Sequence, residues 1–220
     1  MKILKILINQ FLEILFPTKC IGCHKYEDIL CNNCINNLKI TERPTEDNIY
    51  ALYDYKDPIV KDAIWKLKYH HIKYLGEKLG KLLYEGLIEN IDEMKIFQQG
   101  SPIYIIPVPI SNEKKENRGY NQSEVIAKSF CQSGNPNLFL YQNKIIIKNK
   151  NTIPQARLTN RNKRLQNIKG AFSIINTNII KGKTVIIIDD VTTTGGTMLE
   201  IIKILKKSGA KKVIGFAVAH

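Results

Sequence analysis

The chain has 220 residues, enough for one medium-sized domain with its own hydrophobic core, or for one domain and a small appendage. Hydrophobic residues make up 44% of it and charged residues 24%, which is ordinary globular usage and excludes a wholly disordered chain. With 33 basic and 20 acidic residues the net charge is +13, so an anionic partner is expected: nucleic acid, a phosphorylated small molecule or an acidic membrane face.

The first 16 residues are the only candidate for a targeting or membrane-binding sequence. Their apolar run is interrupted by Asn9, Gln10 and Glu13, and Pro17 follows instead of a small-residue cleavage site. No run of 18 apolar residues occurs, so no transmembrane segment is expected. We interpret residues 1–16 as an amphipathic helix packed on the next element, with a membrane-surface or partner-binding helix as the alternative.

Four of the five cysteines lie within fifteen residues, as two Cys-x2-Cys pairs: Cys20, Cys23, Cys31 and Cys34. Each pair directs two thiolates to one centre, and two pairs complete the tetrahedral shell of a structural Zn²⁺ ion. Sulfur fills every position, so a catalytic water has no place on such an ion. We expect a structural zinc knuckle, with a nucleic-acid contact beside it as the alternative.

A polar, turn-rich stretch at 41–48 marks a boundary between two parts of the chain. We predict an N-terminal helix and zinc knuckle at 1–45 and the main domain at 46–220. Within the main domain, strands are expected at 49–55, 103–108, 144–148, 185–188 and 213–218, and helices at 58–67, 75–87, 122–130 and 196–208. Short apolar strands separated by helices indicate an α/β fold, with a parallel sheet covered on both faces.

The most informative segment follows the strand at 185–188. Asp189 and Asp190 close that strand, and a turn rich in hydroxyls and glycine comes next: Thr192, Thr193, Thr194, Gly195, Gly196 and Thr197. Ligands bind at the carboxyl ends of strands in open parallel sheets, and a glycine-rich turn before a helix suits phosphate. Paired carboxylates suit vicinal sugar hydroxyls. The segment therefore predicts a site for a sugar phosphate, with a plain strand–turn–helix connection as the alternative.

This segment resembles the signature of type I phosphoribosyltransferases, which bind phosphoribosyl pyrophosphate (PRPP). Together with the four-cysteine knuckle, the chain resembles the ComF family of competence-associated, phosphoribosyltransferase-like proteins. Further blocks that fit that family are Pro107-Val-Pro109, Arg118-Gly-Tyr-Asn-Gln122, Lys66-Leu-Lys68-Tyr69, and Thr152, Gln155, Leu158, Arg164, Asn167 and Phe172. The matches extend from about residue 15 to the C-terminus.

The resemblance implies a type I phosphoribosyltransferase-like sheet flanked by helices. Asp189 and Asp190 would meet the ribose 2′- and 3′-hydroxyls, and Thr193 to Thr197 would surround the 5′-phosphate. Lys68 and Tyr69 would border the pyrophosphate, with Mg²⁺. His70 and His71 follow where the family has other residues, and we expect a solvated loop there rather than a metal site.

The family's biology implies a cytoplasmic factor that binds single-stranded DNA during uptake and acts with other competence proteins, with the inner membrane as a peripheral location. A homodimer is expected because type I relatives often dimerise. The alternative is a phosphoribosyltransferase in which a nucleobase or amine displaces pyrophosphate from PRPP. Catalysis stays open, because the sequence shows no pocket for the nucleophile. A third hypothesis is a regulator whose DNA affinity responds to PRPP.

The stretch from Lys144 to Lys169 contains eight basic residues and no acidic one. The residues that we assign to a DNA surface are Lys144, Lys148, Lys150, Arg157, Arg161, Lys163 and Arg164, with Arg118. A polyanion is expected there, either a pyrophosphate or a nucleic-acid backbone, and a solvated basic surface is the alternative. Tyr120, Phe139 and Tyr141 are candidates for stacking on bases.

Overall fold

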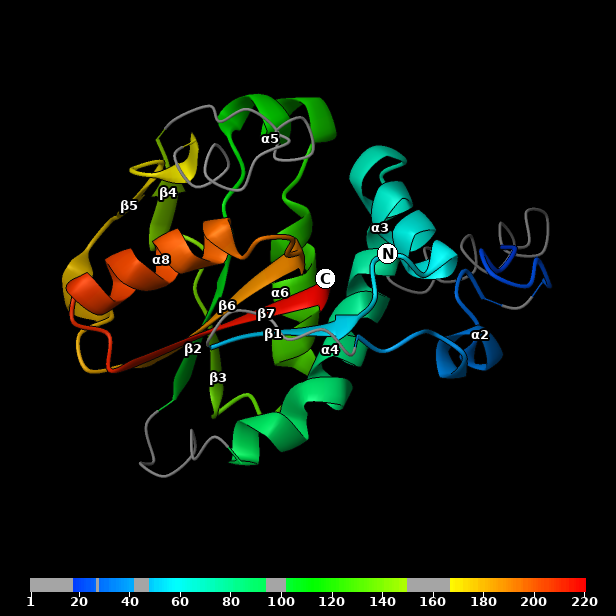
Figure 1. Ribbon diagram of the computed structural model, residues 1–220, viewed down its shortest axis with the longest axis horizontal. Coiled ribbons are helices and arrows are strands. Elements are labelled where there is room, and N and C mark those ends of the chain that lie inside the picture. Colours follow the sequence, from blue (N-terminus) through cyan, green and yellow to red (C-terminus); the bar gives the residue numbers. More distant parts are fainter. Residues whose placement is uncertain (1–17, 27, 42–47, 94–101, 150–166) are drawn as a thin grey trace, which may run out of the picture.

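The computed structural model describes residues 18–26, 28–41, 48–93, 102–149 and 167–220, and only the backbone at 88–93. A five-stranded, all-parallel sheet lies at the centre of the fold (Figure 1). In spatial order its strands are β1 (Ile49–Tyr53), β7 (Lys212–Ala219), β6 (Thr184–Val191), β2 (Ile103–Pro107) and β3 (Phe139–Tyr141). The expected α/β architecture is confirmed.

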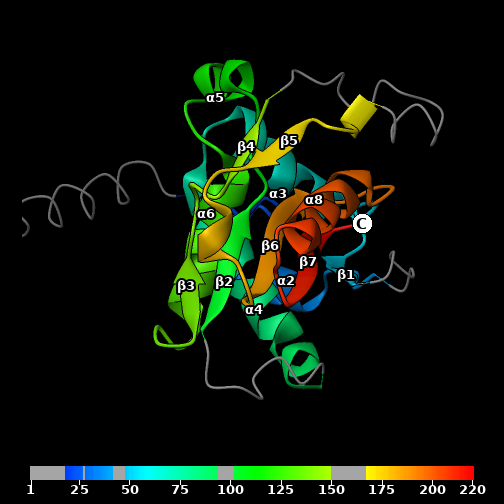
Figure 2. The same ribbon diagram turned by 90° about the vertical axis from the view of Figure 1, so that its left-hand side faces the viewer.

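Helices cover both faces of this sheet, as the edge-on view shows (Figure 2). One face packs against α3 (Pro58–Tyr69), α4 (Lys73–Glu93) and α6 (Gln122–Ser133), and the other packs against α8 (Gly196–Lys207). Residues 185–188 of the central strand β6 are all apolar because both faces of the strand are buried. Ile186 and Ile188 lie in the first core, whereas Val185 and Ile187 lie in the second, because successive side chains of a strand point to opposite faces.

Local signals set the starts of two helices near the sheet's carboxyl edge. The Asp57 carboxylate accepts hydrogen bonds from the amides of Ile59 and Val60 at 2.8 and 3.2 Å, and Pro58 occupies the first turn of α3. The Asn121 side chain likewise accepts from the amide of Ser123 at 3.0 Å at the start of α6. These caps fix where both helices begin relative to the strand ends.

Four short elements were not predicted from the sequence: α2 (Asn32–Asn36), α5 (Asn112–Arg118), β3 and β5 (Phe172–Ile174), with a 3-10 turn at Thr177–Ile179. The strand expected at 144–148 is present as β4 (Ile146–Lys148). It pairs antiparallel with β5 in a separate two-stranded sheet, outside the central one. The helix expected at 1–16 and most of the basic stretch lie outside the described residues.

No helix in the described ranges combines the length and the apolar character needed to cross a membrane.

Candidate functional site

Two adjacent carboxylates lie where the central strand ends. Asp189 is partly exposed and Asp190 is 4% exposed, at the carboxyl end of β6 between the ends of β7 and β2. The first turn of α6 holds both groups. The Ser123 hydroxyl donates to Asp189 Oδ1 at 2.9 Å, and the Gln122 amide nitrogen lies 3.4 Å from Asp190 Oδ1. The two carboxylates are therefore preset in orientation before any ligand arrives.

The two carboxylates differ in their affinity for a proton. Burial alone would raise the pKa of Asp190, but its ion pair with Lys68, from the last turn of α3, outweighs burial and lowers that pKa. Burial, and then the charge of Asp190, raise the pKa of Asp189 to about 8. The acid pair therefore holds a proton more tightly than two separate carboxylates would, and the proton favours Asp189, which can then donate as well as accept a hydrogen bond.

The hydroxyl-rich turn follows directly and leads into α8. Gly195 has φ 70°, the left-handed conformation that favours glycine, and α8 has no side-chain cap at its N-terminus. The backbone carbonyl of Thr193 lies 2.8 Å from His220 Nε2, and the Thr192 amide donates to the Ala219 carbonyl at 2.9 Å. The Thr194 hydroxyl oxygen is buried without a hydrogen-bond partner among the described residues. An anion at this helix N-terminus would satisfy it.

Several cations face this acid pair. Burial, and then the charges of Arg118 and Lys68, lower the pKa of Lys114; burial and the charge of Lys114 lower that of Lys148. The negative charge of Asp189 raises the pKa of Lys148, but the other two effects outweigh it. Arg118 donates to the Gln122 side chain and lies 5.6 Å from the centre of the Tyr69 ring. The site therefore combines two carboxylates with converging positive charge, as a sugar diphosphate requires.

The structure brings some of the sequence candidates together and leaves others apart. Arg118 and Lys148, which we assigned to a DNA surface, lie beside the acid pair, whereas Lys144 is exposed. The other candidates from the basic stretch lie outside the described residues: Lys150, Arg157, Arg161, Lys163 and Arg164. Three residues of the site were not predicted from the sequence: Gln122, Ser123 and Lys114. Gln122 stands in the Arg118–Gln122 block, which was the one available signal for it.

The proposed stacking role of three aromatic residues is wrong for two of them. Tyr120 is 7% exposed, and its hydroxyl donates to the backbone carbonyl of Leu67. Phe139 is 3% exposed and packs edge-on against Phe130 at 5.6 Å. Tyr120 packs between Leu67 of α3 and Lys73 of α4, and Phe139 packs against α6, so both rings are largely closed to a base.

The four clustered cysteines form a second site. Their sulfur atoms all lie within 4.8 Å of one another, and the Cys23 and Cys31 sulfurs are 3.7 Å apart. Thiolates arranged tetrahedrally around zinc at about 2.3 Å stand roughly 3.8 Å from each other. The donor set and its spacing therefore fit Zn²⁺. The first pair lies in a turn closed by an antiparallel bridge between Lys19 and Tyr26. In the second pair, Cys31 is the N-cap of α2 and Cys34 lies on that helix.

The cysteine cluster is part of the core rather than a separate body. Cys20, Cys31 and Cys34 belong to the same buried cluster as α3 and α4. A Cβ atom on Gly22 would lie 2.7 Å from the Cys34 sulfur and 2.8 Å from Ile59 on α3. Burial, and then the neighbouring thiols, raise the pKa of Cys34 to about 12, so four thiolates require a bound cation here.

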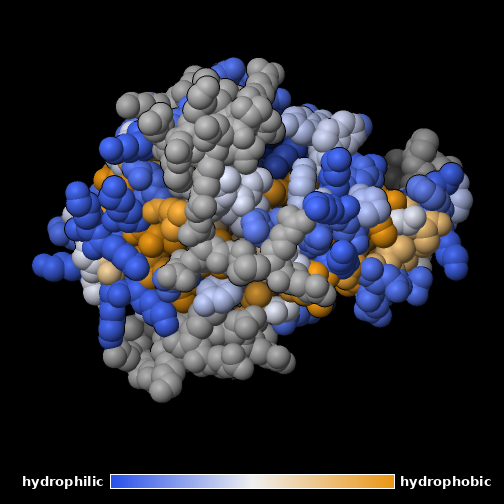
Figure 3. Space-filling model, in the orientation of Figure 1, coloured by the Kyte–Doolittle hydropathy of each residue, from blue (hydrophilic) through white to orange (hydrophobic). Residues whose placement is uncertain are grey.

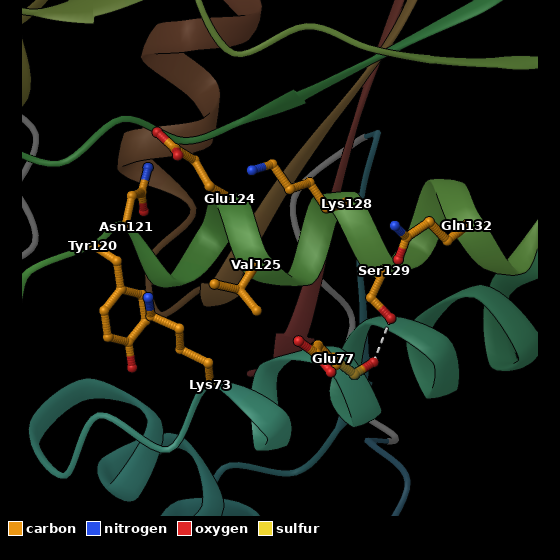
Figure 4. A pocket seen from close by; sticks show the side chains of 9 residues that line it. All are labelled: Lys73, Glu77, Tyr120, Asn121, Glu124, Val125, Lys128, Ser129 and Gln132. Atoms are coloured by element: carbon orange, nitrogen blue, oxygen red, sulfur yellow. Dashed lines mark hydrogen bonds between the residues drawn. The ribbon is translucent and has the colours of Figure 1, made fainter. Parts of the chain in front are cut away.

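A separate hollow of about 280 Å³ lies between α4 and α6 (Figure 4). Its charged lining is balanced: Lys73, Glu77, Glu124 and Lys128. The Lys73 ammonium lies 5.0 Å from the centre of the Tyr120 ring, and the Ser129 hydroxyl donates to the Glu77 carbonyl, the dashed line in Figure 4. With equal numbers of lysines and glutamates, the hollow does not attract a polyanion.

Comparison with known proteins agrees with this geometry. A family described as the phosphoribosyl transferase domain matches residues 116–220. Competence protein F of Haemophilus influenzae is 31% identical over 185 residues, covering 83% of this chain and 75% of that protein. The chain belongs to the ComF family. The DNA utilization protein YhgH of Escherichia coli O157:H7 is 27% identical over 188 residues, covering 83% and 74% of the two chains.

Among solved structures, the allosteric regulatory enzyme of purine biosynthesis aligns at 20% identity with a TM-score of 0.39. The alignment covers 65% of this chain and 25% of that one.

Proposed function

We propose that this ComF-family protein is a DNA-uptake factor that binds single-stranded DNA in the cytoplasm and retains a PRPP site. The observation that carries the proposal is the relationship, over 83% of the chain, to a competence protein and to DNA utilization proteins. The net charge of +13 supports it independently, because a polyanion attracts such a chain.

The acid pair and the turn after it support PRPP as the small-molecule ligand. Asp189 and Asp190 would accept from and donate to the ribose hydroxyls, while the buried Thr194 hydroxyl and the N-terminus of α8 would hold the 5′-phosphate. Thr192, Thr193, Gly195, Gly196 and Thr197 complete that turn. Lys68 and Tyr69 would border the pyrophosphate, and Mg²⁺ would offset its charge.

Calorimetric titration with PRPP and Mg²⁺ tests this ligand. In the double variant Asp189→Asn, Asp190→Asn, we expect PRPP binding to be lost while the fold and the zinc content are kept. Asp62→Asn, which removes a half-buried carboxylate of α3 that pairs with Lys66, is the matched control and should bind as the wild type does. Equal PRPP affinity in the double variant would contradict the assignment.

Fluorescence anisotropy with a labelled single strand tests the DNA proposal. We expect binding that weakens steeply with salt and is weaker for a duplex of the same sequence. Reversing Arg157, Arg161 and Arg164 to glutamate should weaken DNA binding and transformation while PRPP binding stays intact. Absence of DNA binding at physiological salt would contradict the proposal.

A phosphoribosyltransferase activity is the second candidate, and the preset acid pair is the observation that favours it. In that reaction a nucleobase or amine attacks the ribose carbon that carries the pyrophosphate, that C–O bond breaks, and pyrophosphate leaves. A screen of nucleobases for pyrophosphate release tests it. Release that depends on Asp189 and Asp190 would establish the enzyme.

The proposed function also implies a cellular location and protein partners for this chain. We expect the protein in the cytoplasm, with residues 1–16 as a route to the inner membrane, and with other competence proteins and a second copy of the chain as partners. Cell fractionation of full-length protein and of a variant lacking 1–16 tests the location. Light scattering after gel filtration tests the homodimer.

A further inference from the structure

Three neighbouring rings, tilted against one another, lie exposed at the end of α3. Trp65 is 48% exposed and Tyr69 is 59% exposed, and their ring centres are 5.9 Å apart. The exposed His70 ring lies 4.5 Å from the Trp65 ring. Large aromatic rings are usually kept from water, because burying one removes much apolar surface from solvent. We call Trp65, Tyr69 and His70 the aromatic surface.

The sequence of α3 explains why these rings face outwards. The opposite side of the helix carries Ile64 and Leu67, both fully buried against α4 and the sheet. Trp65 and Tyr69 are four residues apart, so they share the outer side of α3. The buried face of α3 is complete without them, and among the described residues Trp65 stays 48% exposed and Tyr69 59% exposed.

Positive charge surrounds the aromatic surface. Arg118 lies over the Tyr69 ring, and the exposed Lys61 lies one helical turn before Trp65. The nearest acid on the helix, Asp62, is already paired with Lys66 at 2.6 Å. Pale, weakly polar atoms lie over the upper end of α3 among blue ones in Figure 3. Exposed rings among cations fit a ligand that is both flat and anionic.

We propose that the aromatic surface stacks against the bases of single-stranded DNA. The inference rests on the proposed function and deepens it, because it names the surface that meets the strand. Bases in a single strand expose their faces and carry a phosphate each, whereas a duplex hides those faces within its own stack. Stacking also tolerates any base sequence, as DNA uptake requires.

The aromatic surface adjoins the acid pair. Tyr69 follows Lys68, whose ammonium pairs with Asp190, and Arg118 contacts both Tyr69 and Gln122. A strand stacked on Trp65 therefore lies beside the cations that converge on the carboxylates. The hollow between α4 and α6 is a weaker candidate, because its charges balance and its one ring, Tyr120, is buried.

The chain has a single tryptophan, so the wild-type protein reports on this surface directly. A stacked base quenches indole fluorescence. We expect an oligothymidine to quench the emission of Trp65, and an abasic strand of equal length, which keeps the phosphates and lacks the bases, to quench it far less. Saturable binding of oligothymidine without quenching would overturn the proposal.

Variants then test whether the stacking contributes affinity. Trp65→Ala should weaken binding of labelled oligothymidine about tenfold, because the variant loses the ring on which a base stacks. Trp65→Tyr, which keeps a ring, should recover most of the affinity. Tyr26→Ala removes a tyrosine of similar exposure, 62%, from the cysteine knuckle and is the matched control.

The outcomes separate the two proposals. If the wild type binds oligothymidine and Trp65→Ala binds it equally well, the aromatic surface is wrong and DNA binding stands. If only Tyr26→Ala binds more weakly, the strand contacts the cysteine knuckle instead. If the wild type binds no single strand, the proposed function fails and this inference fails with it. Thermal melts of each variant show that the fold is intact.

Discussion

Lys68, in the last turn of α3, forms an ion pair with Asp190 at the carboxyl end of β6. The pair ties a helix on one face of the sheet to the central strand, at the edge where ligands bind in such folds. The charge of Asp190 outweighs the burial of Lys68 and raises the pKa of its ammonium, so the cation is retained over the whole physiological range.

Removing the ammonium should destabilise the protein, because it leaves a buried carboxylate without its partner. We expect Lys68→Met, which keeps the chain length, to lower the free energy of unfolding by about 3 kcal/mol. Lys66→Met is the matched control on the same helix: its pair with Asp62 is more exposed, so the loss should stay below about 1 kcal/mol. Urea unfolding measures both, and equal losses would contradict the argument.

Stability should fall as the pH rises through the pKa of Asp189. An aspartate of the unfolded chain titrates near 4, whereas burial and the charge of Asp190 raise the folded pKa of Asp189 to about 8. Between these values the folded state holds a proton that the unfolded state has released. The stabilisation is therefore complete below about pH 4 and is lost as the pH rises through about 8.

We expect the wild type to lose stability from about pH 4 to about pH 8, and Asp189→Asn to lose less over that range. Asp62→Asn is the control, since its half-buried carboxylate pairs with Lys66 rather than with the acid pair, and the change should leave the wild-type slope unchanged. Urea unfolding at several pH values gives the slopes. Identical slopes for all three proteins would show that Asp189 ionises normally in the folded state.

Zinc removal should destabilise the region around α3 as well as the knuckle, because the cysteine cluster shares its buried contacts with that helix. We expect one zinc ion per chain in the wild type, a loss of zinc in Cys34→Ser, and a lower melting temperature in that variant. Cys131→Ser is the control: burial raises the pKa of Cys131 to about 12, and it lies on α6 outside the cluster. Full zinc content in Cys34→Ser would contradict a four-cysteine site.

The main strands could be predicted because each contains a continuous apolar run. β6 lies between β7 and β2 with helices on both faces, so every residue from Val185 to Ile188 must be apolar. The three-residue strands β3 and β5 carry no such signal, since their pairing depends on neighbours far along the chain. The pairing of β4 could not be predicted for the same reason. The sequence predicted a strand at Ile146, but only the structure shows that Ile146 pairs with Ile174 in a second sheet.

The contiguous part of the candidate site could be predicted from the sequence, and the contacts between distant residues could not. The acid pair and the turn after it are contiguous, so their order alone indicated a sugar phosphate. Ser123 contacts Asp189 from 66 positions away, and Lys68 reaches Asp190 from across the fold. Such contacts depend on how α3 and α6 pack on the sheet, and no local pattern encodes that packing.

The contact between α4 and α6 gives a last prediction about how tightly the site is supported. A Cβ atom on Gly80 would overlap the backbone carbonyl oxygen of Ile126 and lie 2.7 Å from Ser129 Cβ, and neither can yield without moving α6. Glycine to alanine normally stabilises a helix by about 1 kcal/mol, but here the overlap should reverse the sign and cost about 1–3 kcal/mol.

Gly86→Ala provides the comparison on the same helix. Its added Cβ would meet only the flexible end of the Leu52 side chain, which can rotate away, so the variant should stay within about 1 kcal/mol of the wild type. Because α6 presents Ser123 to Asp189, Gly80→Ala should also weaken PRPP binding, and Gly86→Ala should not. Urea unfolding and PRPP calorimetry on both variants decide the matter. A Gly80→Ala protein as stable as Gly86→Ala would show that α6 adjusts its position freely, and the orientation of the acid pair would then not depend on this contact.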